Sequence, residues 1–171
     1  MKRKAAFPLL LVAIVLLWAF SDRLFPGPLV AGEAVRAIDG DSLRIDKTVV
    51  RLADIDAPEF SQPCKDRLGF DWPCGRAARH RLAELIAAGG VECRQTGEDR
   101  YRRIVARCAS RSAPDLGAAM VESGHAIGTR ARGSGRYEFE QASARSARRG
   151  IWAGRFTTPA EWRHANSGKD D

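Results

Sequence analysis

Hydrophobic and polar residues follow two different spacings along the chain, and each spacing predicts a type of element. Between residues 34 and 56, Val, Leu and Ile recur with largely alternating spacing, which is typical of strands with one buried face. Asp-Gly-Asp at 39–41 and Asp-Lys at 46–47 interrupt this stretch as turns. The pattern therefore predicts a three-stranded meander over about 34–39, 42–47 and 48–56.

After a polar loop over residues 57–72, the hydrophobic spacing becomes that of α-helices. It predicts three helices, each followed closely by a glycine, over about 73–88, 114–123 and 138–149. Two strand-like segments, about 91–95 and 102–108, lie between the first two helices. This order predicts an α+β fold, namely a five-stranded Greek-key barrel of the OB-fold type with about three helices.

The N-terminus has the composition of an export signal. Three basic residues at 2–4 precede an uncharged, apolar run of 16 residues from Ala5 to Phe20. A membrane-spanning helix prefers roughly 20 residues, so two interpretations remain: an uncleaved signal anchor, which leaves an apolar leader helix, or a cleaved signal peptide. In both cases the basic end stays inside and the domain lies outside, in the periplasm or at the cell exterior. An uncleaved run over 5–20 would anchor it in the membrane.

The length of 171 residues suits one domain and a leader. We expect a leader and linker over residues 1–30, a globular domain over 31–163 and a polar tail over 164–171. A composition of 44% hydrophobic and 29% charged residues is ordinary for a globular protein and argues against long disorder. A monomer is the default state.

The charge of the expected domain is mildly basic. The full chain has a formal charge of +7, but residues 1–30 hold four basic residues and one acidic residue. The remainder has 24 basic and 20 acidic residues, a charge of +4. This excess suits a polyanionic partner and does not by itself identify one.

The four cysteines, Cys64, Cys74, Cys93 and Cys108, all lie in the part expected to be exported. An even number in an oxidising compartment indicates two disulfides, for which three pairings exist. Cys64 and Cys74 bracket one short loop, and Cys93 and Cys108 lie in strand-like segments on either side of a turn, so we expect pairing in that order. A zinc site is the competing interpretation, but no CxxC pair or nearby His supports it.

Carboxylates gather at two expected strand ends. Asp39 and Asp41 belong to one turn, and Asp54, Asp56 and Glu59 end the next strand. Because side chains alternate along a strand, Asp54 and Asp56 are expected on the same side. If the two ends converge, three or four carboxylates share a small volume, which is unfavourable unless a cation offsets their repulsion. Oxygen ligands without Cys or His favour a hard ion such as Ca²⁺. The alternative is that these acids are solvated turn residues.

Two arginines complete the set of candidate catalytic groups. Arg51 lies on the same expected strand as Asp56, and Arg103 begins another. Guanidinium groups bind phosphate oxygens in pairs and stabilise the charge that develops during phosphoryl transfer. A metal ion, an acid and two arginines are the groups that phosphodiester hydrolysis needs. Taken singly, each arginine is more often part of a surface ion pair.

Three segments resemble, in order, the signature segments of the thermonuclease (staphylococcal nuclease) family: Ile-Asp-Gly-Asp-Ser at 38–42, Arg-Leu-Ala-Asp-Ile-Asp-Ala-Pro-Glu at 51–59 and Asp-Arg-Tyr-Arg-Arg at 99–103. Gly-Ile-Trp at 150–152 resembles the C-terminal end of that family. The similarity covers about residues 33–163. Each segment alone is a weak signal, but three in order on a matching plan of strands and helices are specific.

The resemblance implies an OB-fold nuclease that uses calcium, acts on DNA and RNA and leaves 3′-phosphate ends. It implies that calcium is bound by Asp41, Asp56 and the carbonyl oxygen of Ala57. Glu59 would be the general base that activates water. Arg51 and Arg103 would hold the scissile phosphate.

The chain departs from the family pattern at three places. Ser42 replaces a frequent Thr and keeps the hydroxyl. Arg102 replaces the usual Gly, which costs about 1 kcal/mol if that position requires a positive φ. Tyr101 matches one tyrosine that packs on the substrate's base, but arginines, including Arg132, stand where others are expected. Arginine also stacks on bases or contacts phosphate, so we expect Tyr101 and Arg132 to bind substrate with less selectivity for the base.

A non-catalytic OB-fold module of the cell envelope that binds nucleic acid is the alternative function. Such a module would need a basic groove but not Asp41, Asp56 and Glu59 together. Their joint presence with Arg51 and Arg103 favours an exported or membrane-tethered, calcium-dependent nuclease.

Overall fold

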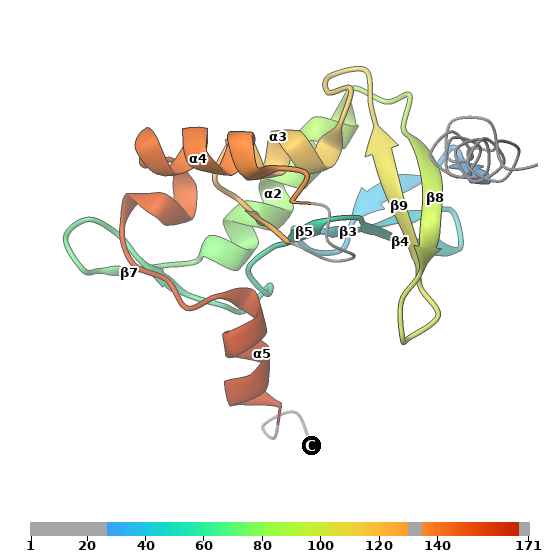
Figure 1. Ribbon diagram of the computed structural model, residues 1–171. Coiled ribbons are helices and arrows are strands. Elements are labelled where there is room, and N and C mark those ends of the chain that lie inside the picture. Colours follow the sequence, from blue (N-terminus) through green and yellow to red (C-terminus); the bar gives the residue numbers. More distant parts are fainter. Residues whose placement is uncertain (1–26, 130–134, 168–171) are drawn as a thin grey trace, which may run out of the picture.

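The computed structural model describes residues 27–129 and 135–167 of the chain (Figure 1). The leader expected over residues 5–20, and with it the choice between anchor and cleaved peptide, lies outside these ranges. Within them, no helix combines the length and the apolar character needed to cross a membrane.

A curled sheet of six strands forms the centre of the fold, in the order β1-β8-β9-β4-β3-β2. The strands are β1 (Leu29–Ala31), β2 (Val35–Ala37), β3 (Ser42–Ile45), β4 (Thr48–Leu52), β8 (Glu92–Glu98) and β9 (Ile104–Ala109). β4 and β9 run parallel, and the other neighbours are antiparallel. In the described part of the chain β1 and β2 remain separate edges, so the sheet is an open half-barrel.

The α+β class and the meander of β2, β3 and β4 are confirmed, but the strand expected over 48–56 is interrupted. Asp54 has a φ of 63°, a left-handed conformation that a regular strand does not contain. β4 therefore ends at Leu52, and a separate strand, β5 (Ile55–Asp56), begins after the turn. β5 pairs with β10 (Ile127–Gly128) rather than with the main sheet.

The strands β1, β6 (Cys64–Lys65), β7 (Asp71–Trp72) and β10 were not predicted. β1 pairs with β8 and raises the number of strands in the main sheet from the expected five to six. The sequence before it, Pro26-Gly27-Pro28, has the composition of a linker, which concealed the strand. The expected loop over 57–72 contains a small hairpin of β6 and β7.

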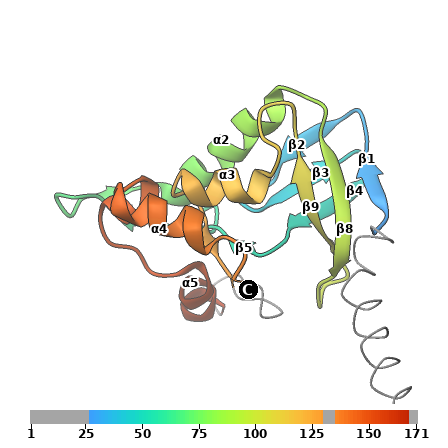
Figure 2. The same cartoon turned by 45° about the horizontal axis from the view of Figure 1, so that its top comes forward.

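The three predicted helices are confirmed as α2 (Cys74–Ala87), α3 (Leu116–Glu122) and α4 (Glu138–Ser146). α2 and α3 lie beside the sheet (Figures 1 and 2), and a 3-10 turn, η2 (Gly150–Ala153), follows α4. A fourth helix, α5 (Pro159–Asn166), was not predicted. Its start has a capping box of Thr158 and Glu161 with a proline in the first turn, a signal that the sequence does contain.

The core lies between the inner face of the sheet and the helices α2 and α3. Its fully buried side chains include Leu43, Val50, Leu82, Leu116 and Met120. In the β3–β4 pair, Leu43 faces Val50 and Ser42 faces Arg51. Because successive side chains point to opposite faces of a strand, the register that buries Val50 places Arg51 on the other face, beside the end of the β2–β3 turn.

Both predicted disulfides are present, Cys64–Cys74 and Cys93–Cys108. Cys93 and Cys108 face each other in the β8–β9 pair, so their bond joins two neighbouring strands. The other bond joins β6 to the first residue of α2. Two disulfides suggest an oxidising compartment outside the cytoplasm.

Replacing Cys93 and Cys108 together by Ala should lower the free energy of unfolding by about 3 kcal/mol, because the unfolded chain loses a loop constraint. The bond closes a loop with a sequence separation of 15 residues. Urea unfolding of the wild type and the double variant under non-reducing conditions measures the difference. Equal stability of the oxidised and the fully reduced wild type would contradict this expectation.

Candidate active site

Asp41 and Asp56 are buried, and one guanidinium joins them. Arg51 donates from Nη1 to Asp41 Oδ1 at 2.6 Å and from Nη2 to Asp56 Oδ1 at 2.9 Å. The Ser42 hydroxyl and the Ala57 backbone N–H also donate to Asp41, at 2.9 and 3.2 Å. The structure therefore brings the β2–β3 turn, the end of β4 and the strand β5 together, which is the condition that the sequence analysis set for a carboxylate cluster.

The turn before Asp41 depends on Gly40. A Cβ at Gly40 would lie 2.6 Å from the Ala57 Cβ and 2.7 Å from the Ala78 Cβ. Any side chain would therefore push this turn away from β5 and α2. Asp39 supports the turn by accepting the Asp41 backbone N–H at 2.9 Å, an Asx-turn.

Burial raises the pKa of Asp41 from its usual 3.8 to about 7, because desolvation outweighs the attraction of Arg51. The negative charges of Asp39 and Asp56 act in the same direction. Desolvation acts to lower the pKa of Arg51, but Asp41 and Asp56 outweigh it and this pKa is raised, so Arg51 stays a cation. Arg51 therefore does not fully compensate the buried carboxylates, and a further cation would stabilise their charged forms.

Asp54 lies outside this carboxylate cluster, which corrects the expectation that it shares a side with Asp56. The positive φ at Asp54 turns the chain between β4 and β5. Its carboxylate instead pairs with Arg107 of β9, with 3.2 Å between Oδ2 and Nη2. Side chains alternate regularly only along one continuous strand, and the turn at Asp54 separates β4 from β5.

Arg163, from α5, contacts Asp56 and Glu59 and was missed by the sequence analysis. Its Nη1 donates to Asp56 Oδ1 at 3.0 Å and to Glu59 Oε1 at 2.8 Å, and its Nη2 donates to Asp56 Oδ2 at 3.0 Å. Hydrogen bonding to Asp56 is the main reason that the pKa of Arg163 is raised. The capping box predicts a helix at this position, but only the fold shows that the helix returns to β5.

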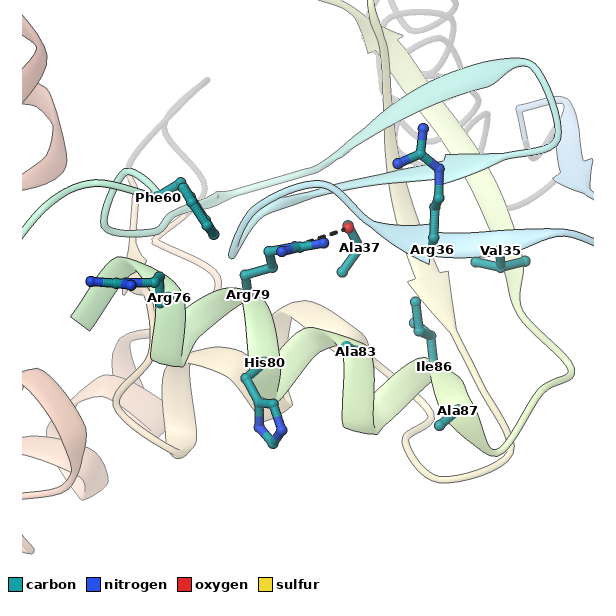
Figure 3. Close-up of a pocket in the computed structure, with 10 residues that line it drawn as sticks. All are labelled: Val35, Arg36, Ala37, Phe60, Arg76, Arg79, His80, Ala83, Ile86 and Ala87. Carbon is teal, nitrogen blue, oxygen red and sulfur yellow. Dashed lines mark hydrogen bonds between the residues drawn. The ribbon is translucent and has the colours of Figure 1, made fainter. Parts of the chain in front are cut away.

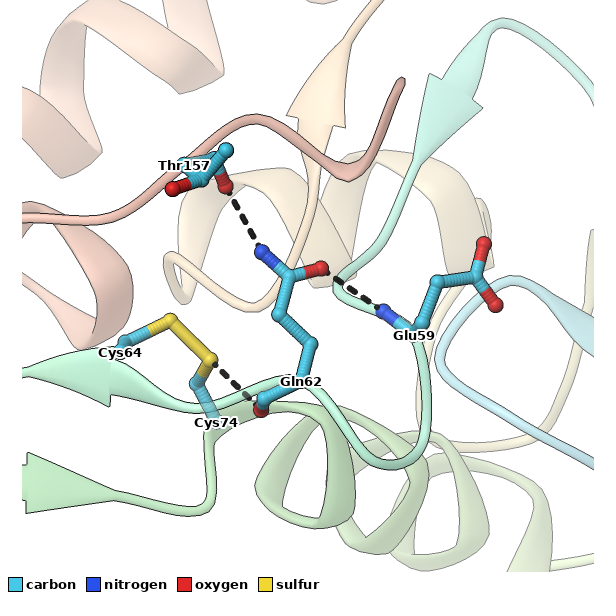
Figure 4. Close-up of a disulfide and its surroundings, with 5 residues drawn as sticks. All are labelled: Glu59, Gln62, Cys64, Cys74 and Thr157. Carbon is cyan, nitrogen blue, oxygen red and sulfur yellow. Dashed lines mark hydrogen bonds between the residues drawn. A yellow bond between two sulfur atoms is a disulfide. The ribbon is translucent and has the colours of Figure 1, made fainter. Parts of the chain in front are cut away.

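Glu59 is held through its backbone by the buried side chain of Gln62 (Figure 4). Gln62 Oε1 accepts the Glu59 N–H at 3.1 Å, and Nε2 donates to the Thr157 carbonyl at 2.7 Å. One side chain thus links the Glu59 loop to the segment that leads into α5. The Cys64–Cys74 disulfide lies beside this link, with the Cys74 sulfur 3.3 Å from the Gln62 carbonyl oxygen.

Asp99 organises the turn between β8 and β9. Its Oδ1 accepts the backbone N–H groups of Tyr101 and Arg103, both at 2.9 Å, and its Oδ2 accepts Arg103 Nε at 2.7 Å. Arg102 has a φ of 61°, the left-handed conformation that favours glycine at this position. Tyr101 is 64% exposed, and the guanidinium groups of Arg100 and Arg103 lie 4.8 and 5.5 Å from its ring centre.

A single cavity of 530 Å³ joins these groups. Four carboxylates and four guanidinium groups line it, together with Ala57, Pro58 and Tyr101: Asp39, Asp41, Glu59, Asp99, Arg51, Arg100, Arg103 and Arg163. The predicted residues Arg51, Glu59 and Arg103 therefore lie around one space. Arg132 is outside the described residues.

The donor set of this site fits a hard cation by its chemistry. Across residues 27–129 and 135–167, no three His, Cys, Asp or Glu side chains are grouped closely enough to hold a metal ion. The oxygens of Asp41 and Asp56 are paired with Arg51, and those of Asp56 and Glu59 with Arg163. All candidate ligands are nevertheless oxygens, and the incompletely compensated charge of Asp41 favours an additional cation.

Replacing Asp41 by Asn should stabilise the chain in chelator at neutral pH. The pKa of about 7 means that the folded chain binds this proton more tightly than the unfolded chain. Stability contributed by Asp41 therefore falls as the pH rises from about 4 to about 7. Urea unfolding with EDTA at about pH 5 and about pH 7.5 should show an advantage of Asp41→Asn that grows with pH. The control is Asp71→Asn, in an exposed ion pair with Lys65, and a wild type more stable than Asp41→Asn at neutral pH would contradict the assignment.

Comparison with known proteins agrees with the motifs. The model of the staphylococcal nuclease homologue family matches residues 49–154. The micrococcal nuclease of Shigella flexneri is 33% identical over 152 residues, which cover 79% of this chain and 81% of that protein. Protein ParB of Escherichia coli is 33% identical over 157 residues, 82% of each chain.

A third relative is matched over a smaller part of its length. Succinoglycan biosynthesis protein ExoI of Rhizobium meliloti (strain 1021) is 36% identical over 124 residues, which cover 72% of this chain and 64% of that protein. The chain thus spans a little less than two thirds of this relative. The family match covers more than half of the chain and includes the residues from Arg51 to Arg103 that line the cavity. The chain belongs to the family of staphylococcal nuclease homologues.

Proposed function

We propose that the chain is an exported, calcium-dependent nuclease that hydrolyses phosphodiester bonds of DNA, RNA or both and leaves 3′-phosphate ends. The main support is one cavity that gathers the carboxylate of Glu59, the guanidinium groups of Arg51 and Arg103 and the buried Asp41. The family, and the relative named micrococcal nuclease, support nuclease activity in general. The two disulfides and the basic, apolar N-terminus support export, with or without a membrane tether.

Arg51 and Arg103 would bind the scissile phosphate. Each arginine has five N–H donors. Arg51 uses one donor of Nη1 for Asp41 and one of Nη2 for Asp56. Arg103 uses the Nε donor for Asp99. The remaining donors of both groups are available to phosphate oxygens that approach through the cavity. Hydrogen bonds to the phosphate strengthen as negative charge develops on it, which lowers the barrier.

Glu59 would take the proton from the attacking water. Its side chain is 35% exposed, and its position is set by Gln62 from the backbone side and by Arg163 from the carboxylate side. A carboxylate held at the wall of a cavity suits general base catalysis. Attack on phosphorus with loss of the 5′ oxygen leaves the phosphate on the 3′ carbon.

Asp41, Asp56 and the Ala57 carbonyl oxygen would hold calcium. When bound, calcium polarises a phosphate oxygen and offsets the negative charge of the carboxylates. Tyr101, at the exposed rim, and Arg132 would contact the bases of the substrate. We further infer that the open half-barrel is a variant of the OB type and that the chain acts as a monomer.

Glu59→Gln and Arg103→Ala should each reduce nuclease activity about 100-fold or more, because each removes a group that acts in the transition state. Cleavage of labelled DNA and RNA by the full chain is measured with calcium and with chelator. Glu92→Gln, at an exposed position of β8, and Arg67→Ala, in the exposed β6–β7 turn, serve as matched controls.

Full activity in both site variants would remove the catalytic assignment. Binding of nucleic acid without cleavage in either condition would instead favour the non-catalytic module. Cleavage that persists in chelator would contradict the use of calcium. The roles of Glu59 and Arg103 would then still be tested by comparing the activity of their variants with that of the wild type.

A further inference from the structure

A second cavity, of 570 Å³, lies between α2 and β2 (Figure 3). Phe60 lines this groove, and it directly follows Glu59 in the chain. Val35, Ala83 and Ile86 supply an apolar wall farther along α2 and β2. We call the 530 Å³ cavity described above the Glu59 cavity. None of the roles proposed for it involves these residues.

Phe60 is 47% exposed, and a guanidinium group lies beside it. Arg79 reaches from α2 towards β2, its guanidinium carbon is 5.5 Å from the Phe60 ring centre, and its Nε donates to the Ala37 carbonyl at 3.4 Å. An exposed aromatic ring next to a guanidinium plane provides a surface on which a nucleobase stacks without regard to its identity.

The groove is cationic. Its lining includes Arg36, Arg76 and Arg79 and no Asp or Glu, whereas the Glu59 cavity has four carboxylates. In Figure 3, Arg76 and Arg79 lie at the Phe60 end, and Arg36 points away from α2. Glu84 of α2 is not part of the lining. It is paired with His80 at 3.2 Å and Arg81 at 3.0 Å. The charge therefore favours a polyanion.

The groove adjoins the loop that carries Glu59, because Phe60 directly follows Glu59 and the start of α2 packs on that loop. A Cβ at Gly75 would collide with the carbonyl oxygen of Glu59 and come within 2.9 Å of the carbonyl oxygen of Phe60. The first turn of α2, with Arg76, therefore packs directly on the Glu59 loop. Glu59 and Phe60 are neighbours in the chain, so the groove begins beside the loop that carries the proposed general base.

We propose that this groove binds the nucleotides on one side of the cleaved bond. Phe60 and Arg79 stack on a base, and Arg76 and Arg79 bind phosphates. The ligand is a single-stranded stretch of DNA or RNA, since stacking and phosphate contacts require neither a particular base nor a particular sugar. The inference rests on the proposed function and adds to it a binding site outside the cavity where the bond is cleaved.

Fluorescence anisotropy of labelled strands of about 12 nucleotides, within the usual range of single-strand binding sites, tests the groove. DNA and RNA are titrated separately into the purified full chain in EDTA, which keeps the strands intact. Phe60→Ala and Arg79→Gln should each weaken binding about tenfold, the size of effect that loss of one stacked base produces. Phe60→Trp should retain the affinity of the wild type, because it keeps the stacking surface.

Two variants outside the groove serve as controls: Phe139→Ala, at a position of α4 that is 84% exposed, and Arg67→Gln, in the exposed β6–β7 turn. The groove is refuted if Phe60→Ala and Arg79→Gln bind as the wild type does, if the controls lose as much affinity, or if Phe60→Trp loses as much as Phe60→Ala.

A parallel cleavage assay with calcium separates the two proposals. Loss of affinity in the groove variants together with no cleavage by the wild type supports the groove and contradicts the nuclease. Cleavage by the wild type with an unchanged KM in Phe60→Ala supports the nuclease and contradicts the groove. If both proposals hold, Phe60→Ala raises KM and leaves kcat unchanged.

Discussion

Burial of the Asp41 carboxylate against Arg51 is the constraint around which the rest of the site is arranged. A buried carboxylate is costly unless opposite charge and hydrogen bonds compensate it, and Asp41 has Arg51, Ser42 and the Ala57 N–H as donors. These donors come from β3, β4 and the end of β5. Their convergence requires the β3–β4 register and the absence of a side chain at Gly40. Compensation is still incomplete, since burial raises the pKa of Asp41, and the calcium ion proposed above would stabilise its charged form.

The C-terminal part of the chain completes the site from the opposite side. Arg163 joins Asp56 to Glu59, and Gln62 joins the Glu59 backbone to the segment before α5. The Cys64–Cys74 bond closes the loop that follows Gln62 in the chain. Glu59 is therefore held, directly and through Gln62, by groups far away in sequence: 104 residues separate Glu59 from Arg163, and 95 separate Gln62 from Thr157. Such preorganisation supports the proposed role of Glu59 as a general base.

The local sequence predicted those parts of the fold whose signals are local. Hydrophobic spacing and terminal glycines located α2, α3 and α4, and two short cysteine separations indicated the disulfides. The approach of Asp41 to Asp56 entered the sequence analysis only as a condition, and the structure meets it through Arg51, which contacts both carboxylates. Asp54 was misplaced because a left-handed turn leaves no trace in the alternation of residues.

Tertiary contacts account for what the sequence analysis missed. β1 consists of only three residues and depends on its pairing with β8. Arg163 has an ordinary sequence context, since its role depends on the path of the chain between η2 and α5. The pairing of its guanidinium with Asp56 and Glu59 is a property of the folded chain alone. The Phe60 groove is likewise visible only once α2 lies beside β2.

Calorimetric titration of calcium into the full chain, above the pKa of Asp41, tests most directly whether the buried carboxylates form a cation site. Asp41→Asn is the matched variant, because it should fold at least as stably in chelator while lacking the charge that a cation would offset. If Asp41 is part of a cation site, we expect saturable binding to the wild type and no measurable binding to Asp41→Asn. A folded wild type that does not bind calcium, or equal binding by both proteins, would contradict it.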